Sequence, residues 1–159
     1  MAGSPTRARA AKALATQALK GRRVVIFGHD SMGMETALAH VLPTRKQFGK
    51  LIGSYQALKH PTVDILTAVD SARSFIYHAA TLVGEGPLDK DAEIACRMAK
   101  AHATDTLLYA GDRAVQFHGG MGFTYECDAQ LYIRRAQWSQ QQYGDAQHHR
   151  KRLATLLLG

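Results

Sequence analysis

The fold is decided by residues 61–84, which read PTVDILTAVDSARSFIYHAATLVG. Apolar side chains recur in this stretch at steps of three and four residues, the spacing that places them on one face of an α-helix. Pro61 suits the first turn of such a helix, and Gly84 suits its C-terminal cap. The stretch therefore predicts a long amphipathic helix with apolar positions at Ile65, Leu66, Val69, Ala72, Ile76, Ala79, Ala80 and Val83.

Three further helices are predicted on the C-terminal side of this stretch. The first begins at Asp89 or Asp91, because aspartate caps helix N-termini, and it ends at the glycines after His118. A shorter helix runs through residues 131–138, and Gly144 interrupts the helical pattern after it. A last helix runs from about Asp145 to residue 157. The predicted apolar face of the first of these helices consists of Ile94, Met98, Ala101, Leu108 and Val115.

The N-terminal side carries the one clear strand signal, the β-favoured run at residues 24–27. A helix capped by Asp30 or Ser31 follows, and it is expected to stop before Pro43, because the residue before a proline is disfavoured in the helical conformation. No internal repeat is visible. The sequence therefore predicts an all-α fold, an antiparallel helical bundle of four or more helices.

Composition sets limits on the class of protein. The chain has 159 residues, of which 46% are hydrophobic, which is enough for one ordinary domain. No apolar run approaches the ~20 residues of a membrane-spanning helix, so no membrane span is expected. The two cysteines, Cys96 and Cys127, form no CxxC pair, and the adjacent His148 and His149 point in different directions on a helix, so no metal site is expected. No secretory signal is visible, and the expected location is the cytoplasm.

The net charge of +7 is concentrated at the N-terminus. Residues 1–23 hold six Lys or Arg and no acid, whereas the other 136 residues hold fourteen bases and thirteen acids. We interpret residues 1–23 as a basic, Ala- and Arg-rich arm and residues 24–159 as the domain. Three explanations of the arm stay open: a transit peptide, which would direct the chain to the mitochondrial matrix, a polyanion-binding segment, or the altered start of a longer chain. Because the body lacks basic stripes interleaved with aromatics, nucleic-acid binding is not expected.

A serine hydrolase is the first alternative raised by the motifs. Residues 24–33 read as a strand followed by GHDSMG, close to a nucleophile elbow, and residues 118–120 are similar to an oxyanion-hole loop. The elbow pattern needs a glycine where this chain has His29, and the oxyanion loop should precede the elbow in the sequence. We therefore interpret Asp30 and Ser31 as a helix cap.

Two other motifs have the chemistry of a dinucleotide site. Residues 45–60 read RKQFGKLIGSYQALKH, and residues 114–124 read AVQFHGGMGFT. Arg45 offers a planar fork for a pyrophosphate, and Phe48 offers an apolar surface for an adenine or ribose. Gly119 and Gly120 let the backbone approach phosphates closely. The alternative is that Phe48 belongs to the core and that the glycines only end a helix.

Together the two motifs resemble the C-terminal helical domain of the acyl-CoA dehydrogenase family, roughly from Val24 to the C-terminus. The segment after the glycines is similar as well, at Tyr132, Arg134, Arg135 and Ala136. The resemblance implies FAD-dependent α,β-desaturation of acyl-CoA thioesters. It also implies that FAD is shared across a subunit interface, with Arg45 and Phe48 reaching the FAD of one subunit and residues 116–120 serving another. The residues implied to contact FAD are Arg45, Phe48, Gln56, Gln116, Gly119 and Gly120.

The chain departs from the family pattern at the catalytic base. Tyr143 occupies the position of the family's glutamate, and a phenol is a poor base at neutral pH, so no catalytic residue is expected. The region of the other family base, near Arg22 and Arg23, is basic. The segment before Arg45 is also about one helical turn short, and the family's N-terminal helical and middle β-domains do not fit in 159 residues.

Two interpretations of function follow from these departures. In the first, the chain is the C-terminal domain of a truncated enzyme or a partner-type subunit, which assembles as a homo-oligomer or with a base-bearing subunit and is inactive by itself. In the second, it is a non-catalytic helical assembly module that makes subunit contacts without flavin.

Overall fold

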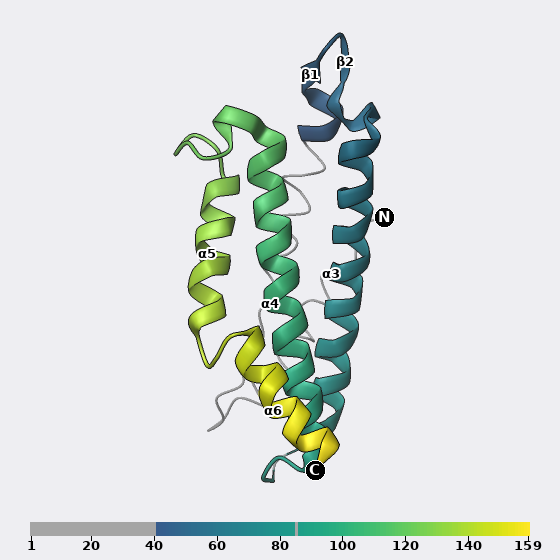
Figure 1. Cartoon of the computed structure of the whole chain (residues 1–159), viewed down its shortest axis with the longest axis vertical. Coiled ribbons are helices and arrows are strands. Elements are labelled where there is room, and N and C mark those ends of the chain that lie inside the picture. Colours follow the sequence, from purple (N-terminus) through teal and green to yellow (C-terminus); the bar gives the residue numbers. More distant parts are fainter. Residues whose placement is uncertain (1–40, 85) are drawn as a thin grey trace.

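The computed structural model describes residues 41–84 and 86–159, and this part of the chain is a bundle of helices (Figure 1). The bundle contains α3 (Gln56–Leu82), α4 (Lys90–His118), α5 (Ala129–Gln141) and α6 (Ala146–Leu158). Helices α3 and α4 run antiparallel, and α5 and α6 both return along α4 (Figure 1). The prediction of an all-α bundle of four or more helices is confirmed. The predicted arm at residues 1–23, the strand at 24–27 and the cap at Asp30 or Ser31 lie outside the described residues.

Short elements gather at one end of the bundle. An antiparallel hairpin of β1 (Lys46–Gln47) and β2 (Lys50–Leu51) pairs Lys46 with Leu51, and the 3₁₀ turn η1 (Ile52–Ser54) joins it to α3. A second 3₁₀ turn, η2 (Gly119–Met121), follows α4 at the same end (Figure 1). The start of α3 and the end of α4 therefore lie near the hairpin.

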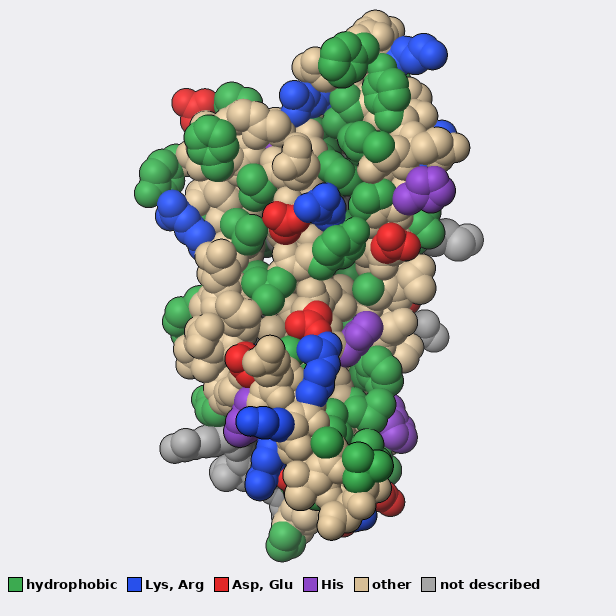
Figure 2. Space-filling view, in the orientation of Figure 1, with side chains coloured by type: hydrophobic (Ala, Val, Ile, Leu, Met, Phe, Trp, Pro, Cys, Tyr) green, Lys and Arg blue, Asp and Glu red, His purple; other side chains and the backbone are tan. Residues whose placement is uncertain are grey.

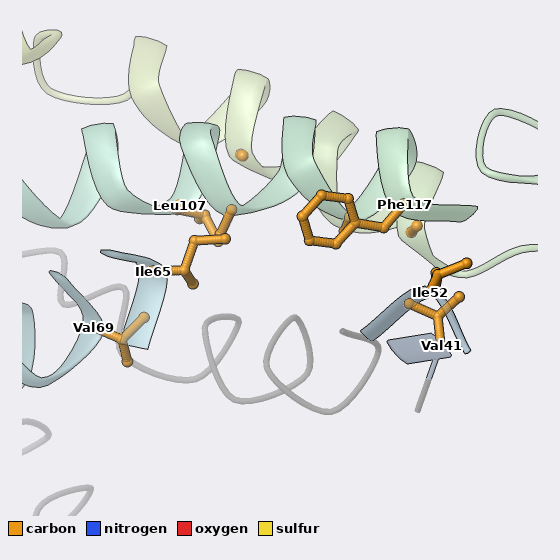
Figure 3. Close-up of a cluster of buried hydrophobic side chains, with 10 residues drawn as sticks. Val41, Ile52, Ile65, Val69, Leu107 and Phe117 are labelled. Carbon is orange, nitrogen blue, oxygen red and sulfur yellow. The ribbon is translucent and has the colours of Figure 1, made fainter. Parts of the chain in front are cut away.

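Helix α4 is the centre of the bundle, since it packs against each of the other three helices. The main core joins α3 to α4 through Ile65, Val69 and Leu107 (Figure 3). Small side chains on α4 and α5 let the helix axes approach closely, and Phe117 fills the end of the core nearest the hairpin. The buried members of this cluster are Val41, Ile52, Ile65, Val69, Leu107, Ala110, Ala114, Phe117, Ala129 and Ala136.

The start of α3 differs from the prediction, because the helix begins at Gln56 and Pro61 lies in its second turn. The residues before the proline are good helix formers, and the Tyr55 carbonyl accepts bonds from the Leu58 and Lys59 amides at 3.1 Å each. The missing N–H of Pro61 removes a single early helical bond, which this turn tolerates. The other end also differs in detail: Val83 is the C-cap, and Gly84 does not adopt a positive φ.

The predicted stop before Pro43 is wrong, because residues 41–44 are helical. The Arg45 amide donates to the Val41 carbonyl at 3.1 Å, so the helical turn closes across the proline. The fixed φ of proline is compatible with a helix, and here it continues the turn that leads into the hairpin.

The predicted apolar face of α4 is confirmed in part, since Leu108 and Val115 pack against the main core. Of its five residues only Ala101 is buried, whereas Met98 is 37% exposed and the other three are half-buried. Because α4 has three neighbours, it buries small residues on several sides, and this pattern escapes a search for large apolar side chains. Asp89 is the N-cap, accepting from the Ala92 amide at 2.7 Å, which selects one of the two predicted starts.

The predictions for the two C-terminal helices are confirmed. Gly144, with φ 99°, lies in the turn between α5 and α6. Asp145 then caps α6 by accepting from the His148 amide at 2.7 Å.

Candidate functional site

All six residues predicted to contact a dinucleotide lie in elements at the hairpin end of the bundle. Arg45 directly precedes β1, and Phe48 lies at the hairpin tip. Gln56 begins α3, Gln116 lies in the last turn of α4, and the two glycines begin η2. The tertiary fold thus brings the motifs at residues 45–60 and 114–124 to the same end of the molecule.

The two motifs meet in a direct contact. The Arg45 guanidinium donates from Nη1 to the Phe117 carbonyl at 2.9 Å. It also lies over Gly119, where a Cβ atom would come within 2.7 Å of Nη1 and 2.8 Å of Nη2. A cation at the C-terminal end of a helix interacts favourably with its unpaired carbonyls and its dipole. Arg45 therefore holds the end of α4 while remaining part of the candidate site.

Position 119 requires a glycine for two reasons, the conformation of its backbone and the close contact with Arg45. It is the C-cap of α4, with φ 62° and ψ −141°, a conformation that is nearly restricted to glycine. Gly119 thus ends the helix, and whether it also contacts a ligand stays a prediction. Gly120 differs, because no atom lies within 4 Å of where its Cβ would be. The space beside Gly120 is open to a ligand.

Phe48 is 92% exposed at the tip of the hairpin, so the alternative that it belongs to the core is wrong. Its φ of 51° and the φ of 77° at Gly49 form the tight turn that presents the ring. The Tyr55 hydroxyl donates to the Gln47 carbonyl at 3.0 Å and fixes the hairpin against the start of α3. The exposed ring is therefore carried on a braced hairpin.

The charge around the site favours an anion. Residues 41–63 hold four basic residues, Arg45, Lys46, Lys50 and Lys59, and no acid. Residues 114–125 hold no Lys, Arg, Asp or Glu. Figure 2 shows basic and hydrophobic side chains beside one another at this end of the molecule. Arginine donors, an exposed aromatic ring and an open glycine backbone are the groups that a dinucleotide needs, so the residues present fit FAD.

Tyr143 lies apart from this site, in the turn between α5 and α6 at the far end of α5 from the hairpin (Figure 1). It is 54% exposed and adopts φ 61°, which is unusual for a residue other than glycine. The structure therefore brings Arg45 and Gly119 together but does not bring Tyr143 to them.

A polar cluster between α4 and α6 was not predicted from the sequence. Arg97 and Lys100 of α4 lie beside His149 of α6, which is 8% exposed, and Lys100 donates to the Ser139 carbonyl at 2.9 Å. Burial lowers the pKa of Lys100. No motif marks these residues, and only the packing of α6 on α4 brings them together.

Among residues 41–84 and 86–159, no group of three or more His, Cys, Asp or Glu is arranged to hold a metal ion. In the same part of the chain, no helix is both long enough and apolar enough to cross a membrane.

The chain matches the family model of the acyl-CoA dehydrogenase C-terminal domain over residues 8–158. The match covers nearly the whole sequence, and the chain belongs to this family. The acyl-CoA dehydrogenase IpdE2 of Mycolicibacterium smegmatis is 36% identical over 109 residues, which are 69% of this chain and 32% of that protein.

Solved structures show the same fold. A chain of the ChsE4–ChsE5 complex from Mycobacterium tuberculosis superimposes with a TM-score of 0.75 at 25% identity, covering 82% of this chain and 35% of that chain. The FAD complex of PigA superimposes with a TM-score of 0.72 at 22% identity, covering 80% of this chain and 32% of that chain. The present chain spans about a third of the length of these proteins.

Proposed function

We propose that this chain is the helical, flavin-holding part of an FAD-dependent acyl-CoA dehydrogenase that catalyses α,β-desaturation of acyl-CoA thioesters. It serves either as a C-terminal domain or as a partner-type subunit. The observation that carries the proposal is the contact of Arg45 with Phe117 and Gly119, which unites the two dinucleotide motifs at the hairpin end. Family membership supports the reaction class. The similarity to a chain of the ChsE4–ChsE5 complex supports a partner-type subunit.

FAD, when bound, supplies the acceptor for the hydride that leaves the β-carbon of the substrate. The part of this chain is to bind and orient it. The bond to Phe117 engages one of the five N–H donors of Arg45, so α4 fixes the guanidinium while other donors can meet a pyrophosphate. The open backbone at Gly120 allows close approach of the same group, and Gly119 leaves room for the guanidinium beside it. The amides of Gln56 and Gln116 add neutral hydrogen bonds.

Phe48 supplies an apolar surface for the adenine or ribose. Because it stands at the tip of a hairpin and is almost fully exposed, it extends beyond its own bundle. This placement supports an FAD shared across a subunit interface, with the hairpin reaching the cofactor of a neighbouring subunit. The acyl-CoA pocket and the base that removes the α-proton are then contributed outside this chain, by a base-bearing subunit or domain.

A binding experiment tests this proposal directly. FAD, FMN and riboflavin are titrated with the protein, and binding is followed by the change in flavin fluorescence. We expect FAD to bind more tightly than FMN and riboflavin, and ADP to compete, because Arg45 and Phe48 recognise the pyrophosphate and the adenine nucleotide of FAD. Equal affinity of the protein for FAD and riboflavin, or no binding of FAD to the oligomeric protein, would contradict the proposal.

A matched pair of variants locates the site. Phe48→Ala removes an exposed ring, so the fold is retained while FAD affinity falls about tenfold, since stacking of an aromatic side chain on a base contributes ~1–3 kcal/mol. Tyr77→Ala is the control, because Tyr77 is also exposed but lies much further along α3. An equal loss in both variants would place FAD elsewhere.

The second candidate is an assembly module that makes subunit contacts without flavin. It is favoured by the exposed apolar side chains on two helices, which include Val63, Leu66 and Tyr77 on α3 and Leu131 and Trp138 on α5. A colourless protein that forms a defined oligomer and does not bind FAD would support it. For either function we propose a cytoplasmic location, or the mitochondrial matrix if residues 1–23 act as a transit peptide.

A further inference from the structure

Helix α6 is attached to the bundle through few side chains. It packs on α4 and crosses its lower half (Figure 1). Its buried residues are Ala146 and His149, and Leu153 and Leu156 are half-buried. Arg150 forms an ion pair with Asp105 of α4, but both side chains are largely exposed, and such pairs contribute little. A histidine is therefore the largest buried side chain that α6 places against α4.

The surroundings of His149 suit a neutral imidazole ring. Arg97 of α4 approaches the ring with Nη1 at 3.4 Å from Nδ1. Arginine can only donate, so Nδ1 accepts and Nε2 carries the proton. Nε2 is buried and has no hydrogen-bond partner of good geometry in the described part of the chain. The Tyr143 backbone is the hydrogen-bonding group near the ring, and it favours the protonated form to a small extent.

Charges of the same sign surround the ring. Helix α4 contributes Arg97 and Lys100, and α6 contributes His148, whose ring lies edge-on at 5.3 Å between centroids. Glu93 is the acid of this cluster, and Arg97 holds it with Nε at 2.8 Å. The Cys96 thiol on α4 also lies near Arg97, and burial raises its pKa. The carboxylate of Asp145 is engaged as the cap of α6.

We propose that His149 makes the docking of α6 on α4 sensitive to pH, with the neutral ring holding the helix and protonation releasing it. A protonated ring would direct a second N–H at the Arg97 guanidinium, which offers only donors. It would also add a positive charge beside Arg97 and Lys100 in a buried place. Release lets the ring reach water, and it is opposed by the apolar contacts of α6 at Ala146, Leu153 and Leu156.

The direction of the pH dependence follows from the surroundings. Burial lowers the pKa of His149, and the charges of Arg97, His148 and Lys100 lower it further, while the Tyr143 backbone raises it to a smaller extent. The released state therefore binds the proton more tightly than the docked state. Docking is complete above the ordinary histidine value of ~6.5 and weakens as pH falls below it, by at most about tenfold per pH unit for a single proton.

Hydrogen exchange followed by mass spectrometry tests this inference, which does not depend on flavin binding. Exchange of the α6 amides is compared with exchange of the α3 amides in the same protein at about pH 7.5 and about pH 5, after correction for intrinsic rates. We expect protection of α6 to fall at the lower pH, by no more than about thirtyfold for a single proton with a released-state value of ~6.5, while α3 keeps its protection. If α6 keeps its protection at the lower pH as fully as α3 does, the proposal is overturned.

Three variants identify the group that responds to pH. His149→Gln keeps a neutral polar side chain and should make α6 protection independent of pH. His148→Gln is the matched control and should keep the loss at low pH. If His148→Gln abolishes the loss, His149 is not the sensor. Arg97→Gln removes the nearest cation and keeps the histidine, so the loss of α6 protection at the lower pH should be smaller than in the unchanged protein, while burial still opposes protonation. Loss of protection in Arg97→Gln as large as in the unchanged protein would refute the proposal, even if His149→Gln does not fold.

Discussion

Replacing Gly119 by alanine tests the contact that unites the two motifs. The added Cβ would lie 2.7 Å from Arg45 Nη1 and 2.8 Å from Nη2, and the residue would have to keep φ 62° and ψ −141°. A residue other than glycine in such a conformation costs ~1–3 kcal/mol. Displacing Arg45 weakens its charged hydrogen bond to the Phe117 carbonyl, an interaction of ~1.5–3 kcal/mol. Because the arginine side chain can move partly aside, we expect a total loss of about 2–4 kcal/mol in the free energy of unfolding.

Urea denaturation followed by the helical circular dichroism signal measures this loss. Gly120→Ala is the control, since Gly120 has no positive φ and no atom within 4 Å of the new Cβ, and it should change stability by less than about 0.5 kcal/mol. Arg45→Ala combined with Gly119→Ala should lose about 1 kcal/mol less than the sum of the two single losses, because Arg45→Ala removes the side chain that the new Cβ would meet. Equal stability of the two glycine variants, or strict additivity in the double variant, would refute the argument.

Three further predictions follow from the core, the exposed faces and Tyr143. Ile65→Ala should lower the free energy of unfolding by about 2–5 kcal/mol, because Ile65 is 2% exposed, whereas Leu66→Ala should have a small effect, because Leu66 is 53% exposed. Equal effects of the two substitutions in urea denaturation would contradict the assignment of the buried face of α3. The isolated chain should be oligomeric or bind apolar dyes, because apolar side chains on α3 and α5 face solvent, and a stable monomer without dye binding in sedimentation and fluorescence would contradict this. The isolated chain with added FAD should not reduce an acceptor dye with a panel of acyl-CoAs, and Tyr143→Glu should not restore activity. The reason is that positioning of the substrate in a complete acyl-CoA pocket can supply ~7–11 kcal/mol of the barrier, and a new carboxylate does not replace it. Turnover that Arg45→Ala abolishes would show that this reasoning is wrong.

Local sequence determined the helices to a large extent. The three- and four-residue spacing of residues 61–84 predicted α3, the glycine and aspartate at 144 and 145 predicted the break before α6, and Asp89 was one of two predicted caps for α4. These features depend on side chains a few residues apart, so they can be read along the chain. The errors arose where local rules were applied too strictly, at Pro43 and Pro61, which the helices tolerate because each proline removes a single amide donor.

The candidate site was predicted in its residues but not in its geometry. The family motifs named Arg45 and Gly119, yet nothing in the sequence indicated that the guanidinium lies over the glycine and binds the carbonyl of Phe117. The exposure of Phe48 was likewise not predicted, since an aromatic residue between Gln47 and Gly49 is compatible with a core or a surface position. The predicted role of all six residues toward FAD stays a prediction.

What the sequence alone determined is the set of helices, their caps and breaks, and the two motifs that define the family. Tertiary structure alone decided which helix faces are buried, because α4 has three neighbours and buries alanines that carry no strong periodic signal. It also decided the meeting of Arg45 with the end of α4 and of His149 with Arg97. Both contacts join residues more than fifty positions apart, and their energies come from hydrogen bonds and burial that exist only once the helices have packed.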